Sequence, residues 1–353
     1  MAAMLPDGRR LGAHLAMATG LVKTAERAVE IGASALQIFS DNPTAWQRRA
    51  EPAPDIEPFR AVLDANDVAP LAIHGSYLIN LAGADEVFHE GSVGLLVAEL
   101  AAARRFGARF VNIHIGSHRG AGLDAGIERI AGGLAQAFAA DGAGLTEPAE
   151  APPSPTPVVT LENSSGGGGG LGIDVPELAA IATGLDRAGI ARSRVAFCLD
   201  TAHLWGAGVD LADKPAVDRL VRSFANEVGI DRLPLVHLND TKSERGSRVD
   251  RHEHLGAGRI GPAGITAILR HPLLADTTYI IETPGMDEGY DAINLNRALA
   301  LARGEPLAPL PPGALTLRGS RSRALTPPRP EREGAGRSAR RADPTPARTS
   351  DGS

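Results

Sequence analysis

Residues 194–203, RVAFCLDTAH, carry the pattern that predicts the fold of this chain. An apolar run of five residues stops at Asp200, and a short turn with His203 follows. A run of this length is typical of a strand that is buried on both faces. Five further segments end an apolar run at a His or a Glu in the same way: LAIHGSYLIN (71–80), RFVNIHIGSH (109–118), VVTLENSSGG (158–167), LPLVHLNDTK (233–242) and TYIIETPG (278–285).

Such runs alternate with longer stretches of helical period, as expected of repeated βα units. The predicted strands lie near residues 10–15, 34–39, 70–74, 109–114, 157–162, 194–199, 234–238 and 278–282, and the predicted helices include 21–32, 55–66, 91–106, 124–140, 175–189, 213–228 and 262–270. Eight units predict a closed (β/α)₈ TIM barrel, whose functional site lies at the carboxyl ends of the strands. An open doubly wound sheet is the alternative, but it would not gather the ends of six consecutive strands around one point.

Two segments depart from the repeat. Residues 141–157 are rich in Pro, Ala and acidic residues and predict a loop insertion before the fifth strand. Residues 306–353 are rich in Pro, Arg, Ser and Gly and hold too few apolar side chains to offset the entropy of ordering. We therefore expect a barrel domain over residues 1–305 and a disordered tail over residues 306–353.

Composition restricts where the protein works. The chain has one cysteine, Cys198, which lies within an apolar run, so we expect a core residue and a reducing compartment. The first twelve residues do not have the form of a signal peptide. No run approaches the ~20 apolar residues that a membrane span needs. These features predict a cytoplasmic protein with no membrane partner.

Net charge does not decide between classes of partner. The whole chain carries −6, but residues 311–353 hold nine arginines against four acidic residues, which leaves −11 for residues 1–310. Bound divalent ions would offset part of that negative charge locally. The overall charge therefore neither supports nor excludes a nucleic-acid partner.

Nine potential metal ligands stand at the predicted strand ends or just after them. They are His74, His114, Glu162, Asp200, His203, His237, Asp250, His252 and Glu282. A single histidine in an apolar run is more often a packed core residue, but here half of the ten histidines occur in this pattern. Imidazole and carboxylate ligands without thiolate suit zinc or a similar divalent ion in a site for hydrolysis or isomerisation.

At these residues the chain resembles the endonuclease IV family of zinc-dependent apurinic/apyrimidinic endonucleases. The motifs HGSYLINLAG, NIHIGSH, LENSSG, CLDTAH, HLNDTK, GSRVDRHEHLGAGRIG and IIETPG occur in the family's order. The resemblance implies a (β/α)₈ barrel with three zinc ions, and manganese is an alternative occupant. It implies that one ion is held by His74, His114 and Glu162, the second by Glu162, Asp200, His237 and Glu282, and the third by His203, Asp250 and His252.

The resemblance also implies an activity. The expected substrate is double-stranded DNA with an abasic site, cut 5′ to the lesion to leave a 3′-hydroxyl and a 5′-deoxyribose phosphate. Trimming of 3′ ends is a second activity that the resemblance allows. A water shared by two ions loses a proton readily, and Glu282, with the bridging Glu162, is the expected catalytic carboxylate. We expect a monomer, because the enzyme must embrace a duplex.

Recognition of a lesion requires further side chains. Tyr77 and Leu78 match the family's intercalating pair and have the chemistry of a wedge that unstacks bases. The other expected DNA contacts are Asn42, Trp46, Arg48, Arg49, Lys242 and Arg251. Thr44 stands where the family places an arginine that probes the duplex, so lesion preference does not follow from the resemblance; Arg48 and Arg49 are the nearest substitutes.

Two alternatives have different chemistry. Sugar isomerases related to xylose isomerase use a Glu, Asp, His, Glu set like Glu162, Asp200, His237 and Glu282. The other five candidate ligands have no purpose in such a site with one ion, which argues against this alternative. A non-catalytic metal store or DNA-binding protein would explain the ligands but not the adjacent Tyr77.

Overall fold

The computed structural model describes residues 4–49, 53–141, 156–286 and 288–317. All of them belong to one compact unit, Met1–Ser322. The remaining unit, Arg323–Ser353, lies outside the described residues. Within the described ranges, none of the helices combines the length and the apolar character needed to cross a bilayer.

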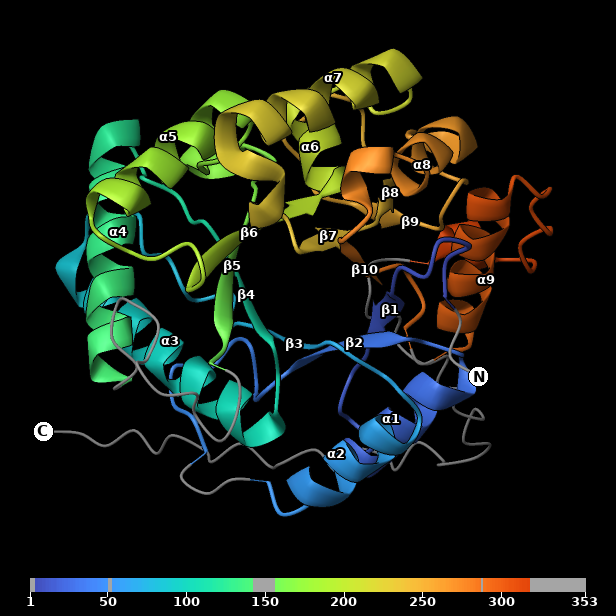
Figure 1. Cartoon of the computed structure of the whole chain (residues 1–353), viewed down its shortest axis with the longest axis horizontal. Coiled ribbons are helices and arrows are strands. Elements are labelled where there is room, and N and C mark those ends of the chain that lie inside the picture. The colour runs from blue at the N-terminus through green and yellow to red at the C-terminus, as the bar shows by residue number, and fades with distance from the viewer. Residues whose placement is uncertain (1–3, 50–52, 142–155, 287, 318–353) are drawn as a thin grey trace, which may run out of the picture. The chain divides into compact units, whose positions relative to one another are not determined.

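Within these residues, eight parallel strands close into a barrel in the order β1, β10, β7, β6, β5, β4, β3, β2 (Figure 1). The strands are β1 (Leu11–His14), β2 (Ala35–Phe39), β3 (Leu71–His74), β4 (Phe110–His114), β5 (Val158–Glu162), β6 (Val195–Asp200), β7 (Leu235–His237) and β10 (Thr278–Ile281). Every predicted strand is confirmed to within one residue at each end. The open sheet is excluded because β1 pairs with both β2 and β10.

Helices surround the barrel (Figure 1). They are α1 (Leu21–Glu30), α2 (Ile56–Ala65), α3 (Glu86–Phe106), α4 (Leu123–Ala140), α5 (Val175–Arg187), α6 (Thr201–Ala207), α7 (Lys214–Phe224), α8 (Gly261–Leu269) and α9 (Tyr290–Arg303). The structure starts α3 five residues earlier than expected, because the Asp85 carboxylate accepts a hydrogen bond from the Phe88 amide and caps the helix. The helices predicted from the sequence do not include α6 or α9, and the two-stranded hairpin of β8 (Asp240–Thr241) and β9 (His252–Glu253) is also not predicted.

The barrel interior is apolar beneath the level of the candidate ligands. Ala35, Cys198, Leu235 and Ile280 form one buried cluster, and Ala72, Phe110, Val158 and Ala196 form another. Side chains two apart on a strand share a face, so Cys198 lies on the same face as Asp200. Cys198 is buried, as expected. These apolar layers fill the barrel below the candidate ligands.

The structure differs from the expected domain end at residue 305. Residues 306–317 continue along the barrel, where the guanidinium of Arg297 donates to the carbonyl of Ala308 at 2.8 Å and His254 Nε2 lies 3.2 Å from the carbonyl of Ala314. Ala314 is fully buried in the short helix η5 (Ala314–Thr316). These contacts fix a segment that is apolar only at a few positions. The remainder of the expected tail, 318–353, and residues 142–155 of the expected insertion lie outside the described residues.

Candidate metal centre

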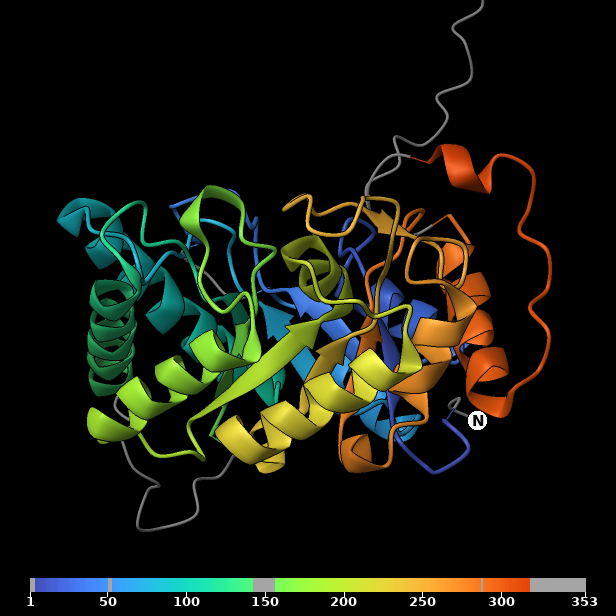
Figure 2. The ribbon, with the colours of Figure 1, turned by 90° about the horizontal axis from the view of Figure 1, so that it is seen from above.

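The nine candidate ligands meet at the carboxyl ends of the strands. His74, His114, Glu162, Asp200 and His237 are the last residues of β3, β4, β5, β6 and β7, and Glu282 follows β10 directly. Strand register sets His114 beside Glu162 and Asp200 beside His237, while His74 and Glu162 pair with the residues two positions before the next ligand, Asn112 and Cys198. The remaining ligands come from α6 and from the hairpin region, both on the upper side of the barrel in Figure 2. A cavity of about 1100 Å³ opens there.

The ligand atoms of His74, His114 and Glu162 lie within 4.8 Å of one another. This set equals the first ligand set that the resemblance implies. His74 Nε2 is 3.7 Å from Glu162 Oε2, and the rings of His74 and His114 are 5.4 Å apart. The other carboxylate oxygen, Oε1, lies 3.3 Å from His237 Nδ1. Glu162 therefore faces two groups of imidazoles with its two oxygens.

A second set, Glu162, Asp200 and His237, is equally close together. Glu282 stands beside it, with Oε2 3.4 Å from His237 Nδ1. A third set joins Asp200, His203 and His252. Asp250 lies against that third set, 3.3 Å from His203 Nε2 and 3.0 Å from His252 Nε2.

All nine predicted ligands are thus brought together. The grouping differs in one respect, because Asp200 reaches the third set as well as the second. The resemblance implies Asp200 as a ligand in the second set alone. Its position at the end of β6, directly before α6, explains the difference, since the carboxylate also caps α6 by accepting from the His203 amide at 2.8 Å.

Backbone carbonyls orient three of the imidazoles. Nδ1 of His74, His203 and His252 each lies close to a carbonyl oxygen, at 2.8, 2.9 and 2.7 Å. A carbonyl only accepts, so Nδ1 carries the proton and Nε2 turns toward the carboxylates. This second-layer arrangement is the one that fixes the tautomer of metal-binding histidines.

Buried carboxamides form a second supporting layer. Gln37 Nε2 donates to Glu282 Oε1 at 2.8 Å, and Gln37 Oε1 lies 3.0 Å from His237 Nε2. Asn112 donates to Glu162 at 2.6 Å, and Asn239 donates to Asp200 at 2.6 Å. These three residues are not among those predicted from the sequence. The available signal is a polar residue two positions from a strand end in an otherwise apolar run, as in Asn112 before His114.

Two buried imidazole nitrogens without hydrogen bonds indicate whether this donor set fits a divalent cation. Among the described residues, His237 Nδ1 and His252 Nε2 are buried and make no hydrogen bond. Both atoms face carboxylate oxygens at 3.0 to 3.4 Å. A buried polar atom without a partner is costly, and an imidazole lone pair among carboxylates suits a cation such as zinc. The residues therefore fit the metal.

Electrostatics favour extra positive charge at the same place. Burial lowers the pKa of His252, but Asp250 and further carboxylates outweigh burial and raise this pKa to about 10. The pKa of His203 responds similarly, since burial lowers it and Asp200 raises it well above its usual value. Burial raises the pKa of Asp200, which is the cost of a carboxylate away from water. Cations bound between these groups would relieve that cost.

Replacing Gln37 with leucine is expected to weaken zinc binding by about 10- to 100-fold. The change leaves His237 Nε2 and Glu282 Oε1 without their shared partner while keeping the side-chain volume similar. Competition with a chromophoric chelator measures the affinity. Ser34→Ala is the matched control, because Ser34 is equally buried and bonds Leu11 just before the start of β2. Equal affinities of the two variants would contradict the role of Gln37.

The expected DNA contacts divide into two groups. Asn42, Tyr77, Arg49, Lys242 and Arg251 line the cavity. Tyr77 is 53% exposed, and its ring centre lies 5.5 Å from that of His74. These positions suit contact with a ligand that enters the cavity.

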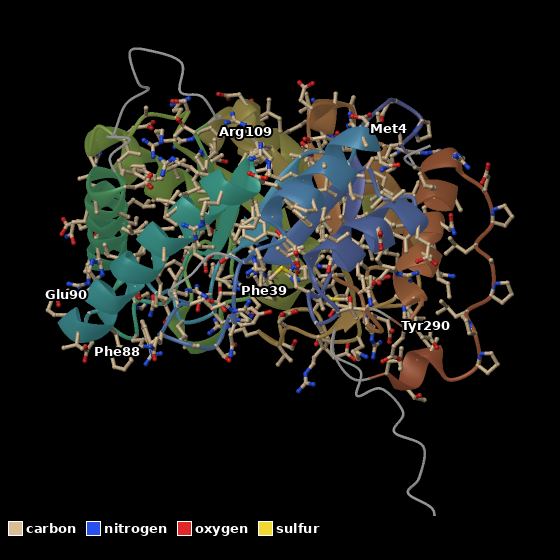
Figure 3. The ribbon with its side chains drawn as sticks, turned by 90° about the horizontal axis from the view of Figure 1, so that it is seen from below. Met4, Phe39, Phe88, Glu90, Arg109 and Tyr290 are labelled. Carbon is tan, nitrogen blue, oxygen red and sulfur yellow. The ribbon has the colours of Figure 1, made fainter. Side chains whose placement is uncertain are left out.

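Leu78, Trp46 and Arg48 are not among the cavity-lining residues. Leu78 is half-buried against the core. Trp46 packs on Phe88 at 5.9 Å between ring centres. Phe88 lies in the first turn of α3, away from Phe39 (Figure 3). Arg48 pairs with the buried Glu99. Of the two arginines that could replace the family's probing arginine, only Arg49 faces the cavity.

Comparisons with known proteins agree with this geometry. The family model described as "Xylose isomerase-like TIM barrel" matches residues 25–303. "Probable endonuclease 4" of Methanoculleus marisnigri is 35% identical over 297 residues, covering 83% of this chain and 98% of that protein. The protein of the same name from Halothermothrix orenii is 36% identical over 291 residues, covering 82% and 99%.

Solved structures extend the comparison. Endonuclease IV from Thermus thermophilus matches with a TM-score of 0.69 and 36% identity over 84% of this chain and 99% of that one. A D-tagatose 3-epimerase-like protein matches with a TM-score of 0.57 at 16% identity over 84% and 97%. The second likeness shows the fold alone.

Proposed function

Because the chain belongs to the endonuclease IV family, we propose that it hydrolyses the phosphodiester bond 5′ to an abasic site in double-stranded DNA. Membership of this family identifies the chain as a nuclease, which is a hydrolase, with a metal-binding TIM barrel. The products would be a 3′-hydroxyl and a 5′-deoxyribose phosphate. Trimming of damaged 3′ ends is proposed as a second reaction of the same site. The cytoplasmic location and the monomeric state stay predictions.

One observation carries the proposal. Three ligand sets lie at one end of the barrel and overlap: Glu162 belongs to the first and the second set, and Asp200 belongs to the second and the third. A sugar isomerase with one divalent ion needs only a set such as Glu162, Asp200, His237 and Glu282. The five further side chains around the same cavity fit a site for three divalent ions, which we propose to be zinc, with manganese as an alternative.

The proposed holders of the ions follow the ligand sets. His74, His114 and Glu162 would hold one ion. Glu162, Asp200, His237 and Glu282 would hold the second, and His203, Asp250 and His252, with Asp200 close by, the third. When bound, zinc supplies Lewis acidity toward phosphate oxygens and lowers the pKa of water.

The chain's own groups would prepare the substrate for hydrolysis. Glu282 would orient the attacking water, because its carboxylate borders the cavity and is held in place by Gln37. Arg49, Lys242 and Arg251 would contact backbone phosphates from the rim. An abasic nucleotide must leave the stack to reach a recessed site, and Tyr77 would fill the gap that it leaves.

Incision of a labelled duplex that carries one synthetic abasic site tests the function. We expect a single cut 5′ to the lesion, a 3′ end that a polymerase extends directly, and no cut in the undamaged duplex. An intact abasic duplex together with one ion per chain and interconversion of a ketose and an aldose would instead establish the sugar isomerase reaction.

A further inference from the structure

A buried carboxylate outside the metal centre links two loops of the cavity rim. Glu99 lies in the middle of α3 and is 1% exposed. It accepts hydrogen bonds from the Ser40 hydroxyl, from the Arg48 guanidinium and from the Ser76 amide, the last at 3.2 Å. Burial raises the pKa of Glu99, and Arg48 opposes that rise. A charged pair, Glu99 with Arg48, therefore stands where an apolar helix face would ordinarily pack.

The donors come from two segments that follow neighbouring strands. Ser40 and Arg48 belong to residues 40–49 after β2, and Ser76 belongs to residues 75–80 after β3; we call these two segments the rim loops. Direct bonds also join them, since the Ser76 hydroxyl donates to the carbonyl of Pro43 at 2.7 Å and the Tyr77 amide donates to the same oxygen at 3.0 Å. The rim loops are therefore held as one unit around Glu99.

Each rim loop presents residues to the cavity. Asn42 and Arg49 come from the first and Tyr77 from the second. Arg48 itself is turned inward, with a side chain 15% exposed, and its Nη1 donates to the carbonyl of Asn42 at 3.2 Å. The guanidinium is thereby committed to Glu99 and to the backbone beside Asn42. It is placed to hold the loop and not to reach a phosphate.

We propose that Glu99 and Arg48 are positioning residues that set Tyr77, Asn42 and Arg49 for substrate binding at the cavity rim. This inference rests on the proposed function for the identity of the substrate. Arg48 is expected from the sequence to contact DNA directly; in this proposal it acts indirectly, by holding the loop that carries Asn42 and Arg49. Among the described residues, neither Glu99 nor Arg48 forms a hydrogen bond or an ion pair with any of the nine candidate ligands. The pair is therefore expected to act on substrate binding and to leave the metal centre intact.

Glu99→Gln is the main test. The amide keeps the size of the side chain but removes the charge that pairs with Arg48 and turns an NH₂ group toward donors. We expect KM for the abasic duplex to rise by about tenfold, with kcat changed less than about threefold and metal content unchanged. Arg48→Lys keeps a positive charge but lacks the fork that bridges Glu99 and the Asn42 carbonyl. It should raise KM in the same direction.

Asp141→Asn is the matched control. The Asp141 side chain is as buried as that of Glu99 and pairs with Arg104, which lies in the last turn of α3, so the variant also breaks an arginine–carboxylate pair of this helix. It should lower thermal stability without raising KM. Equal KM values for Glu99→Gln and Asp141→Asn would overturn the proposal.

Hydrogen exchange in the free enzyme separates this inference from the proposed function. Glu99→Gln should speed exchange of amides in both rim loops, including the Tyr77 amide, and Asp141→Asn should not. Unchanged exchange in the rim loops would overturn the positioning role whatever the enzyme cuts. Faster exchange in a protein whose wild type leaves abasic DNA intact would support the role of Glu99 and contradict the function instead.

Discussion

Replacing Glu282 with glutamine is expected to lower kcat for abasic-site incision by about three orders of magnitude. Glu282 faces His237 Nδ1 with one oxygen and accepts from Gln37 with the other. The amide would set an NH₂ group against one of these nitrogens and remove the negative charge that holds a cation. Single-turnover incision of the labelled abasic duplex, with metal content measured on the same sample, checks the prediction.

Glu177→Gln is the matched control for that loss. Glu177 is a glutamate in the first turn of α5, where its carboxylate accepts from the amides of Gly172 and Ile173. It lies outside the cavity lining, so the same chemical change there should leave kcat within about threefold of wild type. A Glu282→Gln enzyme that cuts at the wild-type rate would remove Glu282 from the mechanism.

The strands of this barrel were predictable because each is buried on both faces. The run that ends at Asp200 has no polar position before its carboxylate, so its end is visible in the sequence. The same property made the ligand positions visible, since an ionisable side chain at the end of a buried strand needs a partner. Parallel strands then bring those ends to one side of the barrel.

Two of the elements that the sequence did not reveal, α6 and the hairpin, lack a clear local pattern of their own. Asp200 ends β6, caps α6 and faces two ligand sets, so the run DTAH shows a possible turn but no helix. Asp250 and His252 are brought to the centre by a hairpin of only two residues per strand, which has no periodic pattern. A local sequence pattern reveals a residue that serves one element more readily than a residue, such as Asp200, that serves two.

Side-chain direction at the rim was the least predictable feature. Tyr77 and Leu78 are neighbours, yet Tyr77 stands at the cavity and Leu78 packs on the core. Arg48 and Arg49 are also neighbours, and the first is turned inward by Glu99, which lies 51 residues further along the chain. The orientation of a loop side chain depends on partners that are distant in the sequence. The sequence alone does not show which residues form such pairs.

Prolonged chelation is expected to abolish incision and to lower the melting temperature by more than about 10 °C, with both restored by zinc. Glu162, Asp200 and Glu282 lie close together in the buried centre, and cations between them offset their repulsion. Metal analysis before and after chelation should give three ions per chain and then fewer than one. Full activity at the lower content would contradict a metal-dependent reaction.

The size of that melting shift should depend on pH. In the metal-free protein, burial lowers the pKa of His203, His237 and His252, but acidic neighbours outweigh burial and raise all three values, that of His252 to about 10. These neighbours are carboxylates for His203 and His252, and Cys198 with Glu282 and Glu162 for His237. A histidine with a raised folded pKa contributes stability that is fully present below its unfolded value of about 6.5 and is lost as pH rises through the folded value. The metal-free protein should therefore lose stability between about pH 6.5 and 10, while the zinc form, whose imidazoles bind neutral, should not lose it in this way. Melting curves of both forms at pH 6 and pH 9 test this, and a zinc-dependent shift that is no larger at pH 9 would show that protonated imidazoles do not replace the cations.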